Sequence, residues 1–368
     1  MDRTGFRLAH LPQLDGLRGT AILAVMIFHA EPPFLAGAFI GVDVFFVLSG
    51  FLITSLLIHE FDRTGAISLR TFYVRRLFRL GPALVLMLAV FCLASLVLLE
   101  REAAQRNLVD ALICLGYMTN WARAFGVHAS DFLGHTWSLS IEEQFYVFWP
   151  LVLLGLLKFT RHRGQVALAA AGLAGLSWFL RAAMTWQGAP IERVYNGLDT
   201  RLDALMIGCA VAAALSSGQM GATVSRWTTR LAPVALLGLL AFCVVGNWMQ
   251  PWIYTWGLFA VAVGAAILIV DVVLRPGSLI GRALAAQWLA WVGTISYGLY
   301  LWHYPIFRSL SVMGYGWPAT LAIGTLATFA VSMVSYHLVE RPLLRRAPVS
   351  RWGQAVPIAD TTPAPIAP

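Results

Sequence analysis

Long runs of apolar residues, separated by short basic segments, dominate this sequence. Of its 368 residues, 59% are hydrophobic and only 12% are charged, and the mean hydropathy is +0.72. Soluble domains carry about 25% charged residues, so this chain has too little polar surface to cover a globular core. The composition therefore excludes a conventional soluble enzyme and indicates that most of the chain lies in lipid.

Ten runs, some of them only with their flanking residues, are long enough for membrane-spanning helices, which need roughly 20 apolar residues. They are Leu17–Ala30, Ala38–Ile58, Leu80–Leu99, Leu139–Leu157, Val166–Met184, Leu202–Leu215, Leu231–Trp248, Trp252–Val273, Trp288–Phe307 and Ala319–Leu338. The stretch Leu108–Trp121 is too short and broken to span, and we interpret it as an amphipathic or re-entrant part of a long loop. We expect an all-α polytopic integral membrane protein with about ten transmembrane helices.

The distribution of basic residues predicts the orientation of these helices. Nineteen of the 26 Lys and Arg side chains fall in the termini and in the alternate loops on one side, and seven fall on the other. Cytoplasmic loops carry the excess of basic residues, so both termini are predicted to be cytoplasmic. The net charge of +8 then reflects topology, and we expect contacts with membrane lipids but no nucleic-acid partner.

Ionisable residues inside membrane helices are costly and therefore mark candidate sites. Arg18 and His29 are eleven residues apart, which places them on one helix face with a rise of about 16 Å between them. Arg18 would then lie at the cytoplasmic interface and His29 near the middle of the membrane. The alternative is a basic anchor residue and a histidine that only packs.

Two further segments combine carboxylates with apolar runs. Asp43 lies near the outer end of the second predicted helix, where Gly41 and Gly50 permit close helix approach. Glu142 and Tyr146 are four residues apart and share one face of the fourth predicted helix. A polar packing seam is the competing interpretation for Asp43, whereas the carboxylates around Glu142 favour a site.

Other candidates lie later in the chain. Asp199, Arg201 and Asp203 could pair with one another in a cluster at a helix end. His303 falls in the outer half of the ninth predicted helix. The four cysteines form no C-x-x-C pair and the histidines have no metal-ligand spacing, so we expect no metal site.

Three arginines gather on the cytoplasmic side just before the third predicted helix. Arg76 and Arg79 are three residues apart, and Arg75 adds a further charge. They could be a topology signal or a contact with anionic lipid. Alternatively, they could capture a phosphate-bearing cytoplasmic ligand, for which the guanidinium group is well shaped.

Six motifs occur in order between Leu11 and Pro342: LDGLRG with the Arg-x10-His spacing, GVDVFFVLSGFLIT, RRLFR, TWSLSIEEQFY, ISYGLYLWHYPI and LVERP. Together they resemble the type-three membrane acyltransferase family, the bacterial O-acetylases of surface polysaccharides and related acceptors. The resemblance implies a ten-helix fold in the bacterial cytoplasmic (inner) membrane that uses a cytoplasmic acyl-CoA. It gives functional weight to Arg18, His29, Arg76, Arg79 and Glu142, and extends to Asp43, Arg201 and His303.

On this basis we expect an O-acyltransferase that moves an acetyl group from acetyl-CoA to a hydroxyl of a sugar-containing acceptor. Arg75, Arg76 and Arg79 would bind the CoA phosphates. His29 would act as general base or form an acyl intermediate, since its imidazole titrates near neutral pH. Glu142 would orient His29 or the acceptor, and Arg18 would hold the CoA arm or stabilise negative charge. Asp43, Tyr146, Arg201 and His303 are candidate acceptor-binding residues.

The expected domain organisation is a membrane acyltransferase domain over residues 1–342 and a disordered Pro-rich cytoplasmic tail over residues 343–368. Many family members carry an additional periplasmic hydrolase-like domain, and a chain ending at Pro368 would be a stand-alone transferase. A proton-coupled transporter or flippase also explains intramembrane charge, and a membrane scaffold is a third alternative. The transporter does not account for six motifs of one family in order, and the scaffold leaves the buried carboxylates unexplained.

Overall fold

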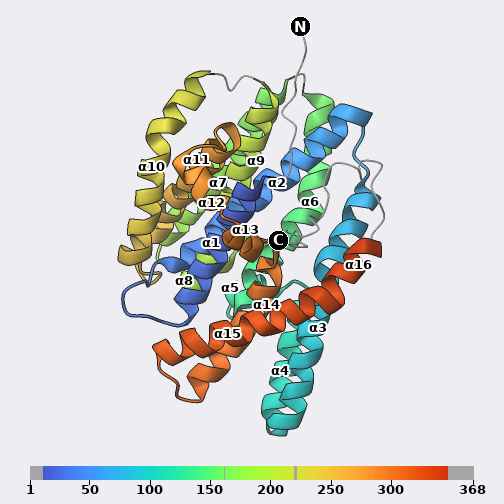
Figure 1. Cartoon of the computed structure of the whole chain (residues 1–368), viewed down its shortest axis with the longest axis vertical. Helices are drawn as coiled ribbons and strands as arrows, with labels where there is room; N and C mark the ends of the chain where they lie inside the picture. Colours follow the sequence, from blue (N-terminus) through green and yellow to red (C-terminus); the bar gives the residue numbers. More distant parts are fainter. Residues whose placement is uncertain (1–10, 161, 219–221, 347–368) are drawn as a thin grey trace, which may run out of the picture.

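The computed structural model describes residues 11–160, 162–218 and 222–346, which form helices and connecting loops (Figure 1). The helices are α1 (Pro12–His29), α2 (Gly41–Thr64), α3 (Leu69–Leu98), α4 (Arg101–Leu115), α5 (Thr119–Ala124), α6 (Trp137–Phe159), α7 (Arg163–Trp186), α8 (Ile191–Asn196), α9 (Leu198–Ser216), α10 (Ala222–Val245), α11 (Leu258–Leu274), α12 (Leu279–Leu284), α13 (Gln287–Thr294), α14 (Ser296–Val312), α15 (Trp317–Ser335) and α16 (Arg341–Arg346). Short 3₁₀ turns η1 (Ala38–Ile40) and η2 (Gly134–Thr136) and π-helical segments η3 (Ile253–Gly257) and η4 (Tyr336–Glu340) adjoin them. The predicted tail lies outside the described residues from position 347 onward.

Seven helical stretches among these residues are long and apolar enough to cross a membrane. They are Ala38–Thr64, Leu69–Leu98, Gly134–Phe159, Arg163–Trp186, Arg226–Val245, Ile253–Leu274 and Trp317–Arg346. The remaining predicted spans correspond to α1, α9 and α14, which have 18, 19 and 17 residues. The expectation of an all-helical multi-pass chain is confirmed, and the count of ten spans stays a prediction.

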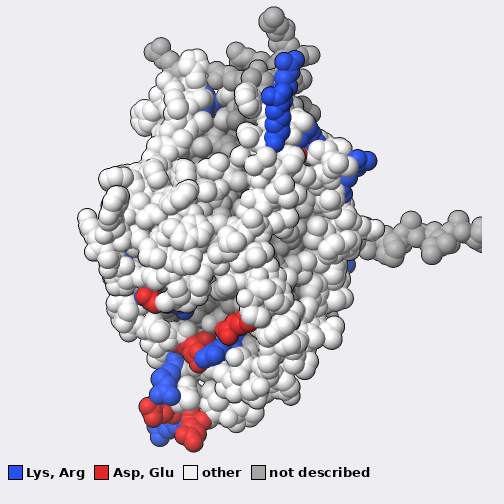
Figure 2. Space-filling view, turned by 90° about the vertical axis from the view of Figure 1, so that its left-hand side faces the viewer, with Lys and Arg blue, Asp and Glu red and all other residues white. Residues whose placement is uncertain are grey.

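Charge is segregated along the molecule in the way a membrane requires. Figure 2 shows Lys and Arg at one end, a mixture of both signs at the other end, and a broad belt between them with few charged side chains. In Figure 1 the ends of α2, α6 and α9 and the starts of α7 and α10 lie at the same end. An uncharged belt between two charged ends is the pattern of a helix bundle that faces lipid.

Two glycines allow the close helix contacts that the sequence predicted. A Cβ at Gly50 of α2 would lie 1.9 Å from the carbonyl oxygen of Leu205 in α9, and one at Gly41 would lie 2.4 Å from that of Ala21 in α1. No side chain fits at such distances. Helix α2 can therefore pack against α1 and α9 with direct backbone contact, which brings together residues from distant parts of the sequence.

The structure corrects the bounds of two predicted helices and places a third segment. The run Trp288–Phe307 is not one helix, because α13 ends at Thr294 and α14 begins at Ser296. The stretch Leu108–Trp121 belongs to α4 and α5, and α4 packs beside α3 as a hairpin (Figure 1). Arg75, Arg76 and Arg79 lie inside the first turns of α3, which begins at Leu69 rather than after them.

Candidate active site

Helix α1 carries candidate residues at both of its ends, as the eleven-residue spacing predicted. Arg18 lies in its second turn and His29 is its last residue. The side chains of both are partly exposed. Each belongs to a different cluster, and we describe the two clusters in turn.

The cluster around Arg18 contains arginines from two helices. Arg79 of α3 is exposed, yet it interacts electrostatically with Arg18 and Arg76. We call Arg18, Arg76 and Arg79 the arginine cluster. Three cations so close together repel one another, so the cluster is suited to a ligand that carries several negative charges. Arg75 is also exposed, on the same helix α3.

Glu142 lies beside this cluster and is held by two hydroxyl groups. Ser49 Oγ of α2 donates to Glu142 Oε1 at 2.5 Å, and the Tyr146 hydroxyl donates to Ser49 Oγ at 2.9 Å. The guanidinium of Arg76 lies 3.5 Å from the centre of the Tyr146 ring. Glu142 also interacts electrostatically with Arg76 and Arg18. The predicted face shared by Glu142 and Tyr146 therefore points toward the arginine cluster.

At the other end of α1, His29 contacts a second histidine, and the hydrogen bonds fix the protonation of both rings. His303 Nδ1 lies 2.7 Å from the carbonyl oxygen of Tyr300 and 3.1 Å from that of Leu299. A carbonyl oxygen only accepts, so Nδ1 carries the proton and a neutral His303 has a bare Nε2. His29 Nδ1, 3.0 Å away, must donate to that Nε2. The second nitrogen of His29, Nε2, is then left without a proton.

A third histidine, which the sequence analysis missed, completes this group. The ring of His135 lies 5.4 Å from that of His303 and 5.0 Å from that of Tyr304, and the Tyr304 ring lies 4.8 Å from His29. We call His29, His135 and His303 the histidine cluster. His135 directly precedes the TWSLSIEEQFY motif, and its position next to that motif was the available signal.

The histidine cluster is held by direct contacts between its side chains. The shortest contact within it is the direct hydrogen bond between His29 and His303. Among the described residues, no group of three or more His, Cys, Asp or Glu side chains is placed to hold a metal ion. The direct hydrogen bond between His29 and His303 is an arrangement suited to proton transfer.

The two clusters are separate but adjoin through α6 and α14. Glu142 accepts a hydrogen bond from Ser49 and not from His29. His29 is hydrogen-bonded to His303 instead. Between them, Ser138 and the Tyr300 hydroxyl are 2.5 Å apart, and that hydroxyl donates to the carbonyl oxygen of His135 at 2.8 Å. The site therefore has an arginine end and an imidazole end, related by about 16 Å of helix.

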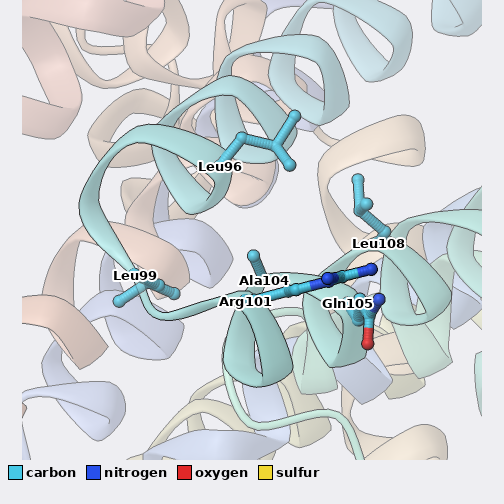
Figure 3. Close-up of a pocket in the computed structure, with 6 residues that line it drawn as sticks. All are labelled: Leu96, Leu99, Arg101, Ala104, Gln105 and Leu108. Carbon is cyan, nitrogen blue, oxygen red and sulfur yellow. The ribbon is translucent and has the colours of Figure 1, made fainter.

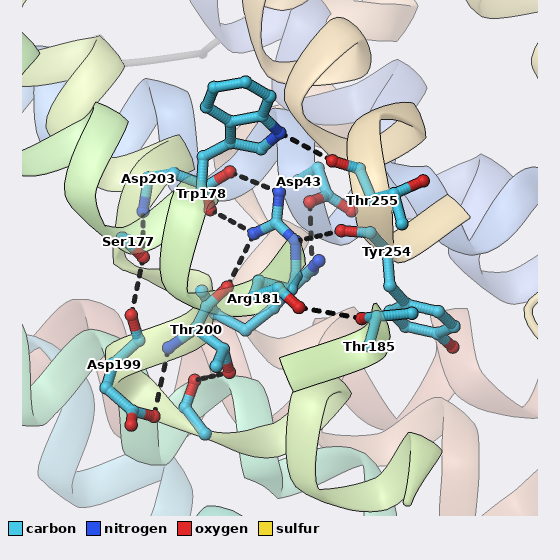
Figure 4. Close-up of polar contacts among 12 residues, drawn as sticks. Asp43, Ser177, Trp178, Arg181, Thr185, Asp199, Thr200, Asp203, Tyr254 and Thr255 are labelled. Carbon is cyan, nitrogen blue, oxygen red and sulfur yellow. Dashed lines mark hydrogen bonds and ion pairs between the residues drawn. The ribbon is translucent and has the colours of Figure 1, made fainter. Parts of the chain in front are cut away.

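Asp43 and Arg201 form a buried ion pair instead of lining either cluster. Their side chains are each 1% exposed and 2.9 Å apart. The sequence suggested that Asp203 could pair with Arg201. Instead, Asp203 accepts two hydrogen bonds from Arg181, at 2.6 and 2.7 Å (Figure 4). Asp199 likewise pairs with Arg193, at 2.5 Å. Arg201 also lies over the rings of Phe46, Trp137 and Tyr195. This geometry favours a role in holding α2, α7 and α9 together.

A groove of about 390 Å³ lies between the end of α3 and the start of α4, lined by Leu96, Leu99, Arg101, Ala104, Gln105 and Leu108 (Figure 3). None of the candidate residues lines it. A second, apolar groove of about 480 Å³ runs between α1 and α15, where Met26 and Ile27 adjoin His29. Neither groove contains a cluster of ionisable side chains, so the candidate chemistry stays with the two clusters.

Comparison with known proteins matches residues 11–337 to the family model described as an acyltransferase domain. The peptidoglycan O-acetyltransferase OatA of Listeria monocytogenes is 33% identical over 356 residues, covering 92% of this chain and 57% of that protein. The O-acetyltransferase OatA of Staphylococcus aureus is 35% identical over 354 residues, covering 92% and 58%. The chain thus spans little more than half the length of these relatives. No solved structure gives a significant match.

Proposed function

The chain belongs to the type-three membrane acyltransferase family, and we propose that it moves an acetyl group from acetyl-CoA to a hydroxyl of a sugar-containing acceptor. The observation that carries the proposal is the hydrogen bond between His29 Nδ1 and His303 Nε2, which, with a neutral His303, leaves Nε2 of His29 without a proton. A nitrogen held in this state is ready to accept the proton of an attacking hydroxyl.

The arginine cluster supports acetyl-CoA as the donor. Coenzyme A carries a pyrophosphate and a 3′-phosphate, and guanidinium groups bind phosphate with charge-assisted hydrogen bonds. Arg79 and Arg76 interact electrostatically, and Arg79 is exposed, as binding of a soluble ligand requires. With the phosphates at this end, the flexible pantetheine arm would run along α1 toward His29. The thioester would then reach the histidine cluster.

The proposed transfer step uses His29 as general base. The acceptor hydroxyl oxygen attacks the thioester carbonyl carbon while His29 Nε2 takes the hydroxyl proton. The tetrahedral intermediate then collapses, the carbon–sulfur bond breaks, and the CoA thiolate takes the proton from His29. His303 keeps the His29 ring oriented throughout. An acyl-His29 intermediate would use the same nitrogen as nucleophile.

Peptidoglycan or a precursor of it is the acceptor class that we propose. The support is the similarity to the Listeria relative, a peptidoglycan O-acetyltransferase. Peptidoglycan offers sugar hydroxyls, the kind of group that the proposed step requires. We place the protein in the bacterial cytoplasmic membrane with the arginine cluster toward the cytoplasm, as the excess of basic residues at that end predicts.

The test is transfer of radiolabelled acetyl from acetyl-CoA to peptidoglycan fragments by the purified full chain in liposomes. We expect label in the fragments with the wild type, and a loss of about 10²–10⁴-fold in rate with His29→Ala. The matched control is His162→Ala, because His162 is an exposed histidine at the start of α7. A transporter or flippase would leave the fragments unlabelled with every variant, which would refute the proposal.

A further inference from the structure

We propose that Arg123 and His135 bind the carbonyl oxygen of the thioester and stabilise the negative charge that develops on it during acyl transfer. The inference rests on the proposed function and deepens it. It assigns a catalytic role to two residues outside the predicted site, one in the short helix α5 and one in the turn η2.

The reaction needs hydrogen-bond donors at this position. Attack of a hydroxyl on a thioester moves an electron pair onto the carbonyl oxygen, and an enzyme accelerates the step by placing donors around that oxygen. Arg18 was the sequence-based candidate for this charge. It lies about 16 Å of helix rise from His29, at the arginine cluster. The donors must therefore come from groups that surround the histidine cluster.

Arg123 is the cation that lies there. It interacts electrostatically with both His29 and His135. Its guanidinium passes directly over Gly134, since Nη1 lies 2.6 Å from where a Cβ on Gly134 would be, and the Tyr304 hydroxyl lies 3.7 Å from the same point. The guanidinium of Arg123 thus lies beside Tyr304, whose ring contacts both His29 and His135.

Arg123 also lacks the partners that a structural arginine has. Its Nε is buried without a hydrogen-bond partner, and among the described residues no carboxylate pairs with it. Of the acids in this part of the fold, Asp131 pairs with Arg308 at 2.7 Å and Asp110 pairs with His128, while Glu31 is exposed to solvent. A guanidinium held beside two imidazoles without a counter-ion is suited to an oxygen that becomes negative only during reaction.

His135 shows the same lack of partners. It is 3% exposed, and neither Nδ1 nor Nε2 meets hydrogen-bond geometry with a partner, although the backbone carbonyl of Leu301 lies near enough to interact with the ring. Buried polar groups are normally paired, so an unpaired imidazole beside a candidate general base points to a ligand. In its neutral form the ring has one N–H to donate. His135 and Arg123 would together present two or more donors to one oxygen.

The chemistry balances without any further reactant. The carbon–oxygen bond forms as the carbonyl electron pair moves onto oxygen, and Arg123 and His135 donate hydrogen bonds to that oxygen. When the carbonyl re-forms, the carbon–sulfur bond breaks and the thiolate receives the proton held by His29. Arg123 and His135 change neither their protonation nor their covalent bonds.

Steady-state kinetics on the full chain in liposomes tests the inference, with acetyl-CoA and peptidoglycan fragments. Loss of one donor to the oxyanion typically lowers kcat by about 10²–10³-fold. We therefore expect Arg123→Gln and His135→Phe to lower kcat by at least about 100-fold with little change in the KM for acetyl-CoA. The control Arg106→Gln removes an exposed arginine paired with Glu102 and should leave both constants unchanged.

A variant that keeps the arginine guards against a simple loss of folding. Gly134→Ala places a methyl group 2.6 Å from Nη1 of Arg123 and so displaces the guanidinium without removing its charge. It should also lower kcat, and Arg123→Lys should retain more activity than Arg123→Gln. Unchanged kcat in Arg123→Gln, or a raised KM alone, overturns the inference while leaving the acyltransferase intact. A wild type that transfers no acetyl group overturns the proposed function as well.

Discussion

The link between His303 and His29 predicts a specific kinetic signature. His303→Leu removes the acceptor for His29 Nδ1–H but leaves His29 itself in place. A neutral hydrogen bond is worth about 0.5–1.5 kcal/mol net, and 1.36 kcal/mol corresponds to tenfold in rate. If His303 only orients His29 and fixes its tautomer, kcat should fall by about 2- to 13-fold. That is much less than the loss expected for His29→Ala.

Three variants make this prediction sharp. His303→Gln has a carboxamide oxygen that can accept from His29 Nδ1–H, so it should recover part of the activity lost in His303→Leu. In a His29→Ala background, His303→Leu should cost nothing more, because its partner is already gone. The assay is kcat for acetyl transfer in liposomes, with the KM for acetyl-CoA as the control for folding and donor binding.

A different pattern would refute the reasoning. If His303→Leu were as damaging as His29→Ala, and His303→Gln restored nothing, His303 would itself exchange the proton or touch the substrate. Equal activity of His303→Leu and the wild type would show that the 3.0 Å contact does not matter for turnover. Either outcome would remove the basis for treating His29 Nε2 as the prepared base.

Three further predictions concern the rest of the site. Arg79→Ala should raise the KM for acetyl-CoA about tenfold and leave kcat nearly unchanged, because an exposed phosphate contact contributes binding energy that salt screens; a titration of acetyl-CoA against rate at two salt concentrations checks this. Glu142→Gln should not raise that KM, since it removes a negative charge from beside the arginines that would bind the phosphates; a raised KM would show instead that Glu142 holds these arginines in place. Asp43→Asn should lower the thermal unfolding temperature in detergent, because it leaves Arg201 as an unpaired buried charge at a cost of about 3–5 kcal/mol; unchanged stability would contradict the structural role.

Local sequence patterns were enough to predict most of the helices and the placement of Arg18 and His29 on one helix. Apolar runs identify membrane helices because each helix must be long and apolar enough to cross the hydrocarbon core and must satisfy its own backbone hydrogen bonds. The Arg18–His29 spacing needed only helix geometry, and both residues lie in α1. The break between α13 and α14 was missed because hydropathy continues through it. Gly293 marks that region, where a Cβ would lie 1.8 Å from the carbonyl oxygen of Asp15.

Partners across the chain could not be predicted in the same way. Arg201 has two acids within two residues of it in the sequence, yet it pairs with Asp43 on a different helix. Local spacing shows which side chains can pair, but helix packing decides which ones do. The same limit hid Arg123 and His135, whose meaning depends on contacts with α1 and α14. Proximity to a motif was the one local signal for His135, and Arg123, in the short helix α5, had none.

The separation of the two clusters on α1 also bears on how a donor and an acceptor from opposite sides of a membrane could meet. The arginine cluster lies toward the end of the molecule with the excess of basic residues, and the histidine cluster lies at the other end of the same helix. In the proposed reaction, acetyl-CoA would keep its charged phosphates at the aqueous end while its thioester reaches the histidines. The acceptor then needs only to present a hydroxyl at His29, and no charged group has to cross the uncharged belt. Only the neutral acetyl group would pass from one side to the other, which lowers the electrostatic cost of transfer across a bilayer.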